Sequence, residues 1–76
     1  MFTAIIEYLD ADYGHIHYQE FSADNITEVE RYARRHTITE TVAELEHNDD
    51  SVTVGVAVVT VLHNNKTLFT TRHRFD

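Results

Sequence analysis

The sequence has 76 residues, with 13 acidic and 6 basic side chains, and it contains no cysteine and no proline. This length predicts one domain over residues 1–76, and the lack of cysteine excludes disulfides as a source of stability. A hydrophobic content of 42% is ordinary for a folded protein, and no apolar run reaches the roughly 20 residues that a membrane-spanning helix needs.

The net charge of −7, with histidines neutral, indicates which partners to expect. Binding to phosphate backbones depends on Lys and Arg, so we expect no direct contact with nucleic acid or with an anionic membrane. An acidic surface instead favours a basic protein partner. The first residues lack a basic stretch followed by an apolar one, which predicts no signal peptide and a cytoplasmic location.

A β-hairpin is predicted at the start of the chain. Residues 2–9 are rich in β-branched and aromatic side chains, which is typical of a strand. Residues 10–14 have turn composition, with Gly14 expected at a positive φ angle. Residues 15–21 alternate in polarity, as the second strand of such a hairpin would.

The period then changes to that of a helix over residues 25–36. The apolar stripe that carries this spacing is Ile26, Val29, Tyr32 and Ala33. Asn25 followed by Glu28 resembles a capping box at the start of a helix. Arg31, Arg34 and Arg35 would then lie in the last turns, where cations are favoured by the helix dipole.

Three further strands are predicted after this helix, at residues 39–46, 52–62 and 67–75. A turn is expected over 48–50, and Asn64-Asn65 suits a two-residue type I′ turn. The resulting order is β-β-α-β-β-β. The predicted fold is therefore α+β, with a five-stranded antiparallel sheet and one helix packed on one of its faces.

One predicted strand, residues 52–62, is apolar on both of its sides. A strand with this composition is usually buried on both faces, and one helix covers only one face of a sheet. We therefore expect a second copy of the chain or a partner protein on the other face, over Ala57, Val59 and Val61. The alternative is that the small sheet twists and partly shields itself.

No arrangement of residues predicts catalysis. The chain has only two glycines, and it contains no phosphate-binding loop and no nucleophile motif. His15 and His17 are expected on one face of a strand, yet zinc needs three or four ligands and no further spaced pair is present. The sequence predicts a protein that is not an enzyme and that holds neither a metal nor a cofactor.

Two groups of charged residues are candidates for binding a partner. The first group is acidic and contains Glu40, Glu44, Glu46, Asp49 and Asp50. The second group is basic and contains Arg31, Arg34, Arg35, Arg72 and Arg74. The acidic group would form a stripe along the predicted third strand that docks on a basic surface, or it would simply keep an edge strand soluble. The arginines would bind an acidic group on a partner. Alternatively, the helical arginines would only interact favourably with the helix dipole.

Residues 25–33, together with the preceding hairpin and Thr41-Val42-Ala43-Glu44-Leu45-Glu46, resemble a pattern in some small phage-encoded anti-CRISPR proteins of β-β-α-β-β-β order. The resemblance implies a non-catalytic inhibitor that binds a subunit of a CRISPR-Cas effector complex in the bacterial host cell and blocks binding of target DNA. This chain departs from the pattern in being acidic where those proteins are richer in lysine.

A second resemblance gives an alternative function. Residues 2–7 followed by residues 10–14 are similar to the opening hairpin of HicB-type antitoxins, which neutralise a small ribonuclease toxin. Those proteins continue with a segment that contains proline and glycine, which this chain lacks. A structural homodimer with merely solubilising charges is the remaining alternative.

Overall fold

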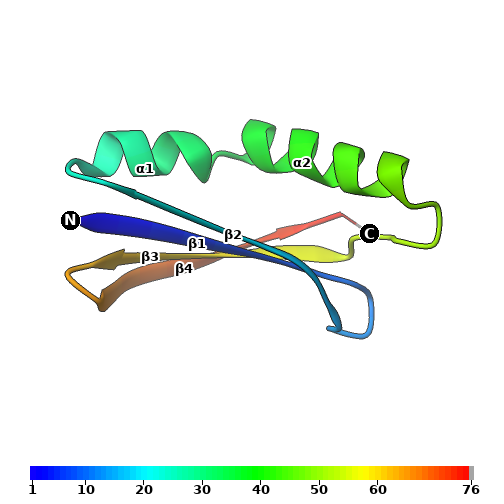
Figure 1. Ribbon diagram of the computed structural model, residues 1–76. Helices are drawn as coiled ribbons and strands as arrows, with labels where there is room; N and C mark the ends of the chain where they lie inside the picture. The colour runs from blue at the N-terminus through cyan, green and yellow to red at the C-terminus, as the bar shows by residue number, and fades with distance from the viewer. Residues whose placement is uncertain (76) are drawn as a thin grey trace.

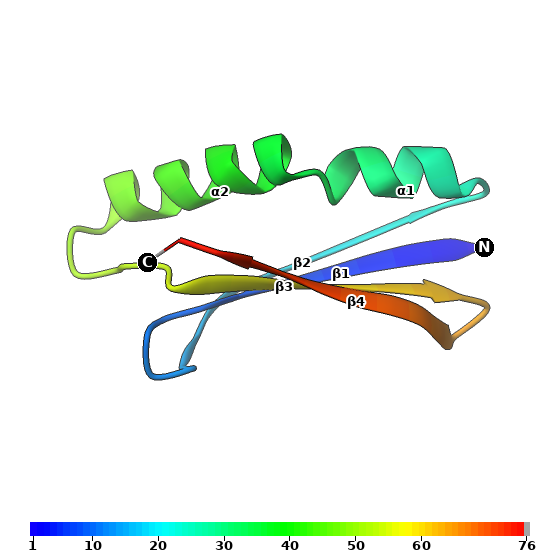
Figure 2. The same ribbon diagram turned by 180° about the vertical axis from the view of Figure 1, so that it is seen from behind.

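The chain folds into a four-stranded antiparallel sheet with a helical layer on one face (Figure 1). The structure is a computed structural model that describes residues 1–75. Its elements in chain order are β1 (Phe2–Leu9), β2 (His15–Ala23), α1 (Ile26–Tyr32), α2 (Arg35–Asn48), β3 (Val56–His63) and β4 (Lys66–Arg74). The strand order is β2-β1-β3-β4, so a central β1–β3 pair joins two hairpins. The view from behind shows α1 and α2 over the same face of the sheet (Figure 2).

The predicted α+β class and antiparallel sheet are confirmed, but the predicted five strands are wrong. Residues 39–46 are not a third strand, because they lie inside the helix α2. The helix predicted over residues 25–36 is divided between α1 and the start of α2. The element order is therefore ββααββ. The strand predicted over residues 52–62 begins only at Val56, after a loop that leads out of α2.

The helix α2 forms although its sequence is rich in β-branched residues. Ile38, Val42 and Leu45 follow one another at i, i+4 and i+7, so they share one helix face, and that face packs against the sheet. The hydroxyls of Thr39 and Thr41 donate to carbonyl oxygens four residues earlier, at 2.7 and 3.2 Å. Their polar groups are thus satisfied within the helix, and burial of the apolar face outweighs the strand propensity.

The turn between β1 and β2 uses its glycine differently from the prediction. Tyr13, with φ 63°, takes the left-handed conformation, and Gly14 does not. The carboxylate of Asp10 accepts hydrogen bonds from the backbone N–H groups of Asp12 and Gly14, both at 2.8 Å. A Cβ atom at Gly14 would lie 2.8 Å from an oxygen of that carboxylate. Gly14 is therefore needed for close approach rather than for a positive φ angle.

Two local predictions are confirmed. The side chain of Asn25 accepts a hydrogen bond from the backbone N–H of Glu28 at 2.9 Å, so it caps α1 as expected. Asn64 and Asn65 connect β3 to β4 with φ angles of 51° and 69°, as a type I′ turn requires.

The core lies between the sheet and the helices. Its buried residues include Ala4, Ile6 and Tyr8 on β1, Val29 on α1, Ile38 on α2, and Ala57, Val59 and Val61 on β3. The prediction that Ala57, Val59 and Val61 face a partner is wrong, because these side chains are at most 1% exposed beneath the helices. The uncovered side of the central strands is the opposite one, which we call the open face. On β1 and β3 it consists of Thr3, Ile5, Glu7, Leu9, Val56, Val58, Thr60 and Leu62.

Candidate protein-binding surface

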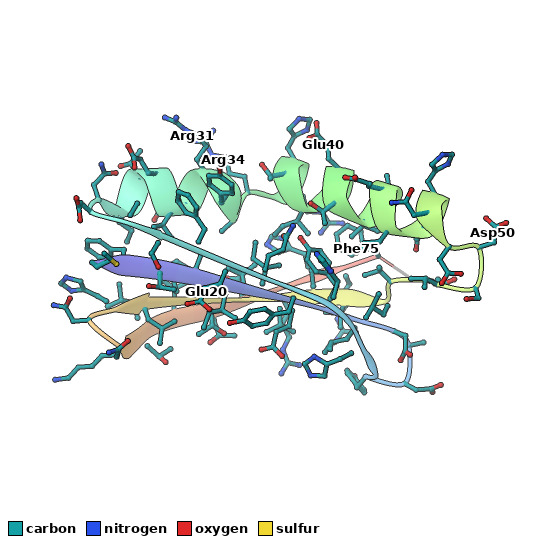
Figure 3. The ribbon with its side chains drawn as sticks, viewed as in Figure 1. Glu20, Arg31, Arg34, Glu40, Asp50 and Phe75 are labelled. Atoms are coloured by element: carbon teal, nitrogen blue, oxygen red, sulfur yellow. The ribbon has the colours of Figure 1, made fainter. Side chains whose placement is uncertain are left out.

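The residues of the predicted acidic stripe lie on α2 and in the loop that follows it, and we call them the acidic segment. Its residues are Glu40, Glu44, Glu46, Asp49 and Asp50. Between residues 36 and 65 the chain contains these five acids and neither Lys nor Arg. Figure 3 shows Glu40 pointing away from the sheet and Asp50 in the loop beyond the end of α2. The surface therefore bears uniform negative charge without the regular spacing of a strand.

Three members of the acidic segment have partners within the chain. A carboxylate oxygen of Glu46 accepts a hydrogen bond from the backbone N–H of Val54 at 2.9 Å, which ties the loop after α2 to the helix. Asp49 accepts bonds from both the hydroxyl and the backbone N–H of Ser51, at 2.7 and 3.0 Å. These bonds, the hydroxyl's first, hold the pKa of Asp49 below its usual range. A carboxylate oxygen of Glu40 lies 2.9 Å from Nε2 of His36, one turn earlier on α2. The side chains of Glu40, Glu44 and Asp50 are exposed and accessible to a partner.

The order of charges along α2 is opposite to the one that its dipole favours. The helix begins after Arg34, the N-cap residue, which makes no side-chain capping bond, and no acid lies in its first turn. Anions are stabilising near the N-terminus of a helix and cations near its C-terminus. Glu40 and Glu44 lie one turn apart, a spacing at which like charges repel. The contact of Glu40 with the exposed His36 offsets this little, so these acids add little stability to the helix that carries them.

The five candidate arginines form two groups, which meet where the Arg35 side chain bonds the backbone of Arg74. Arg31 lies in the last turn of α1, Arg34 is the N-cap of α2 and Arg35 is its first residue; all three are exposed. Figure 3 shows Arg31 pointing away from the sheet. Arg72 and Arg74 lie at the end of β4 and share the open face, as their pairing with Val58 and Val56 requires. The prediction was that the helical arginines lie in the last turn of a helix, where its dipole stabilises a cation. Of the three, Arg31 alone lies in such a position.

Arg35 links α2 to the end of β4 by a hydrogen bond and a ring contact. Its guanidinium donates to the carbonyl oxygen of Arg74 at 2.9 Å and lies 4.6 Å from the centre of the Phe75 ring. Phe75 lies between α2 and the sheet (Figure 3). This contact also brings a positive charge close to the partly buried His73. Burial and then the charge of Arg35 lower the pKa of the His73 imidazole from its ordinary value.

The lowered pKa of His73 predicts a loss of stability in mild acid. The unfolded chain takes up a proton on this imidazole more readily than the folded one. Its contribution is therefore complete above about pH 6.5 and is lost as the pH falls below that value. We expect His73→Asn to reduce the difference between the midpoints of urea unfolding at about pH 7.5 and pH 5.5. An unchanged difference would contradict this role of His73.

The two strand histidines lie on opposite faces of the sheet, contrary to the prediction. His17 pairs with Tyr8 and His15 with Leu9, so the register shifts between Tyr8 and Leu9. The extra residue turns His15 toward the open face, where its Nε2 lies 3.4 Å from a carboxylate oxygen of Glu7. Among residues 1–75, no three His, Asp or Glu side chains are grouped so that they could hold a metal ion.

Two shallow cavities follow the edge strand β2 beneath the helices and meet at Gln19. One, of about 250 Å³, is lined by Phe21 and Tyr32, whose rings stack at 3.8 Å. The other, of about 300 Å³, is lined by Thr41 and Glu44 on α2. Between them the buried Tyr8 hydroxyl donates to Gln19 at 2.8 Å, and burial raises its pKa. Glu44 is thus the one acidic residue that lines the cavity beside α2, within the part of the chain that the structure describes.

Sequence reasoning missed Gln19 and Thr41, which line these cavities, and the residues of the open face. Gln19 and Thr41 give no signal in the sequence, since small polar residues are common on any surface. The open face had a usable signal in residues 2–9, because Ile5 and Leu9 alternate with the buried Ala4, Ile6 and Tyr8. That pattern predicts a strand with apolar side chains on both faces.

No protein-family profile, no curated protein and no solved structure matches the chain. Within residues 1–75 the structure contains no helix with the length and apolar character needed to cross a membrane.

Proposed function

We propose that this chain is a non-catalytic binding protein that docks on a basic surface of a protein partner through Glu40, Glu44 and Asp50. The observation that carries the proposal is the run of five acids, without Lys or Arg, along α2 and the loop that follows it, toward the helix end whose dipole disfavours anions. Exposed acidic residues that add little stability to the helix need a reason other than folding to be there. Attraction of a basic partner is such a reason, because complementary charge speeds encounter and selects partners.

The class of partner that we propose is a complex that handles nucleic acid, with a CRISPR-Cas effector as the specific case. The basic path that holds DNA in such a complex has the chemistry that an acidic helix fits. The resemblance to anti-CRISPR proteins supports this case through residues 25–33, which begin a capped helix after a hairpin. The β-β-α-β-β-β order of those proteins does not support the resemblance, since the observed order is ββααββ.

The decisive experiment measures target-DNA binding by purified effector complexes in the presence of this protein. We expect the wild-type protein to inhibit binding and the inhibition to weaken as salt is raised. Reversing three charges together, by Glu40→Lys, Glu44→Lys and Asp50→Lys, should weaken inhibition at least about tenfold and flatten its salt dependence. The matched control reverses three exposed acids elsewhere, by Asp12→Lys, Asp24→Lys and Glu30→Lys, and should retain inhibition.

The outcomes of this experiment separate the alternatives. Equal losses in both triple variants would show that net charge alone matters, which would contradict a defined docking site. No inhibition of any effector by the wild-type protein would overturn the CRISPR case, and tight binding of a small ribonuclease would favour the antitoxin alternative. As a check on folding, Glu40→Gln with Glu44→Gln should leave the midpoint of urea unfolding unchanged or raised while it weakens inhibition.

A further inference from the structure

The open face of the sheet has apolar side chains at its centre and, within residues 1–75, no helix over it. At one end of this face the β1–β2 turn, with Asp10 and Tyr13, lines a cavity together with Val56, Arg72 and Arg74. Both views show the helices on the other side only (Figures 1 and 2). Ile5, Val58 and Leu62 lie on this face and are only partly buried. Tyr18, on the neighbouring β2, is 52% exposed. An apolar surface of this kind on a small domain usually marks an interface.

Charge is distributed unevenly across the open face. The strand register aligns four residues in one row that crosses the sheet: Tyr18 on β2, Glu7 on β1, Val58 on β3 and Arg72 on β4. Glu20 follows two residues after Tyr18 on the same face of β2, and its carboxylate accepts a bond from the Tyr18 hydroxyl at 2.6 Å. The face is therefore acidic over β1 and β2, apolar at its centre and basic over β4.

We propose that a second copy of this chain covers the open face, with a two-fold axis that runs parallel to the strands between β1 and β3. Such an axis exchanges β1 with β3 and β2 with β4. It places Arg72 of each subunit over Tyr18 and Glu7 of its partner, so that each contact forms twice. An axis across the strands would instead bring the acidic side of each copy against the acidic side of the other.

The contacts made by these charges within one chain leave them available for this interface. The ion pairs described among residues 1–75 join His15 to Glu7 and His36 to Glu40, so neither uses an arginine. In the dimer, the guanidinium of Arg72 would pair with the carboxylate of Glu7 and lie on the ring of Tyr18. The half-buried Glu7 would thereby gain a full cation in place of a histidine that is charged only when protonated.

The size of the open face fits a specific dimer. Strands of eight residues extend about 27 Å, and four strands spaced by about 4.8 Å give a width of about 19 Å. Two such faces in contact bury roughly 1,000 Å² of accessible surface, which is near the lower limit for a biological interface. Sheets packed face to face in this way keep their strands within about 30° of one another.

The test is a charge swap measured by sedimentation velocity on the full chain. The wild-type protein should be a dimer at about 100 μM that dissociates on dilution. Arg72→Glu opposes Glu7 with a second acid, and Glu7→Arg opposes Arg72 with a second cation. Each variant alone should raise the dissociation constant at least about tenfold. An equimolar mixture of the two should restore the dimer, because both cross-subunit pairs are then complementary.

The controls distinguish this interface from other outcomes. Arg31→Glu makes the same charge change as Arg72→Glu on the outer side of α1 and should leave the dimer intact. Circular dichroism checks that each variant is folded, and a chain with both swaps should dimerise with itself. A monomeric wild-type protein, or variants that the mixture does not rescue, would overturn the proposal. A dimer formed along the exposed edge of β4 would be weakened by Arg72→Glu but not rescued by Glu7→Arg.

Discussion

Replacing Ile38 with alanine should lower the free energy of unfolding by about 2–4 kcal/mol. Ile38 is fully buried and is the first apolar residue of α2 that contacts the core. A domain of 76 residues is stabilised by only about 4–11 kcal/mol in total. The loss should therefore be visible as a large shift in the midpoint of urea unfolding, followed by circular dichroism.

The neighbouring Thr39→Ala variant is the matched control for Ile38→Ala. Thr39 is exposed, and its hydroxyl donates only to the carbonyl oxygen of Arg35 within the helix. Its replacement should change stability by less than about 0.5 kcal/mol. Similar effects of the two variants would contradict the burial of Ile38 beside an exposed Thr39.

Gly55→Ala should lower the free energy of unfolding by about 1–3 kcal/mol, because the added methyl group has no space. A Cβ atom at Gly55 would lie 3.1 Å from the backbone nitrogen of Ala11 and 3.2 Å from the carbonyl carbon of Asp10. Gly55 also donates to the carbonyl oxygen of Leu9 at 2.8 Å and accepts a bond from the Phe75 N–H at 3.0 Å. The backbone there cannot shift without disturbing the first turn and the end of the chain.

A comparison with Gly14→Ala isolates the effect of the backbone at Gly55. The atom that obstructs a methyl group at Gly14 belongs to the Asp10 side chain. Gly14→Ala should therefore cost little when Asp10→Ala is already present, whereas Gly55→Ala should keep its full cost in that background. Urea unfolding of the single and double variants gives both values. A Gly55→Ala cost that disappears with Asp10→Ala would contradict obstruction by the backbone.

The acidic segment shows how far residue types alone could predict the candidate site. The sequence placed Glu40, Glu44 and Asp50 in one acidic group, and the structure leaves these three exposed. It could not separate them from Glu46 and Asp49, whose hydrogen bonds to Val54 and Ser51 depend on the path of the loop. Docking of this segment on a partner stays a prediction until it is measured.

The sequence by itself determined the parts of the fold that depend on neighbouring residues. The first hairpin, the Asn25 cap and the Asn64-Asn65 turn each follow from contacts within a few positions along the chain. Hydrogen bonds and backbone angles of this range are set by residue type, because no distant element has to be in place first.

Only the tertiary structure decided the state of residues 39–46 and the face of the sheet that is covered. Threonine and valine favour a strand locally, but burial of Ile38 and Val42 against the sheet stabilises a helix by more than the difference in propensity. The central strands β1 and β3 carry apolar side chains on both faces, so their sequences are compatible with helices on either side. Packing of the two helices covers Ala57, Val59 and Val61 and leaves Ile5 and Val58 on the open face, since one helical layer can bury only one side of a sheet.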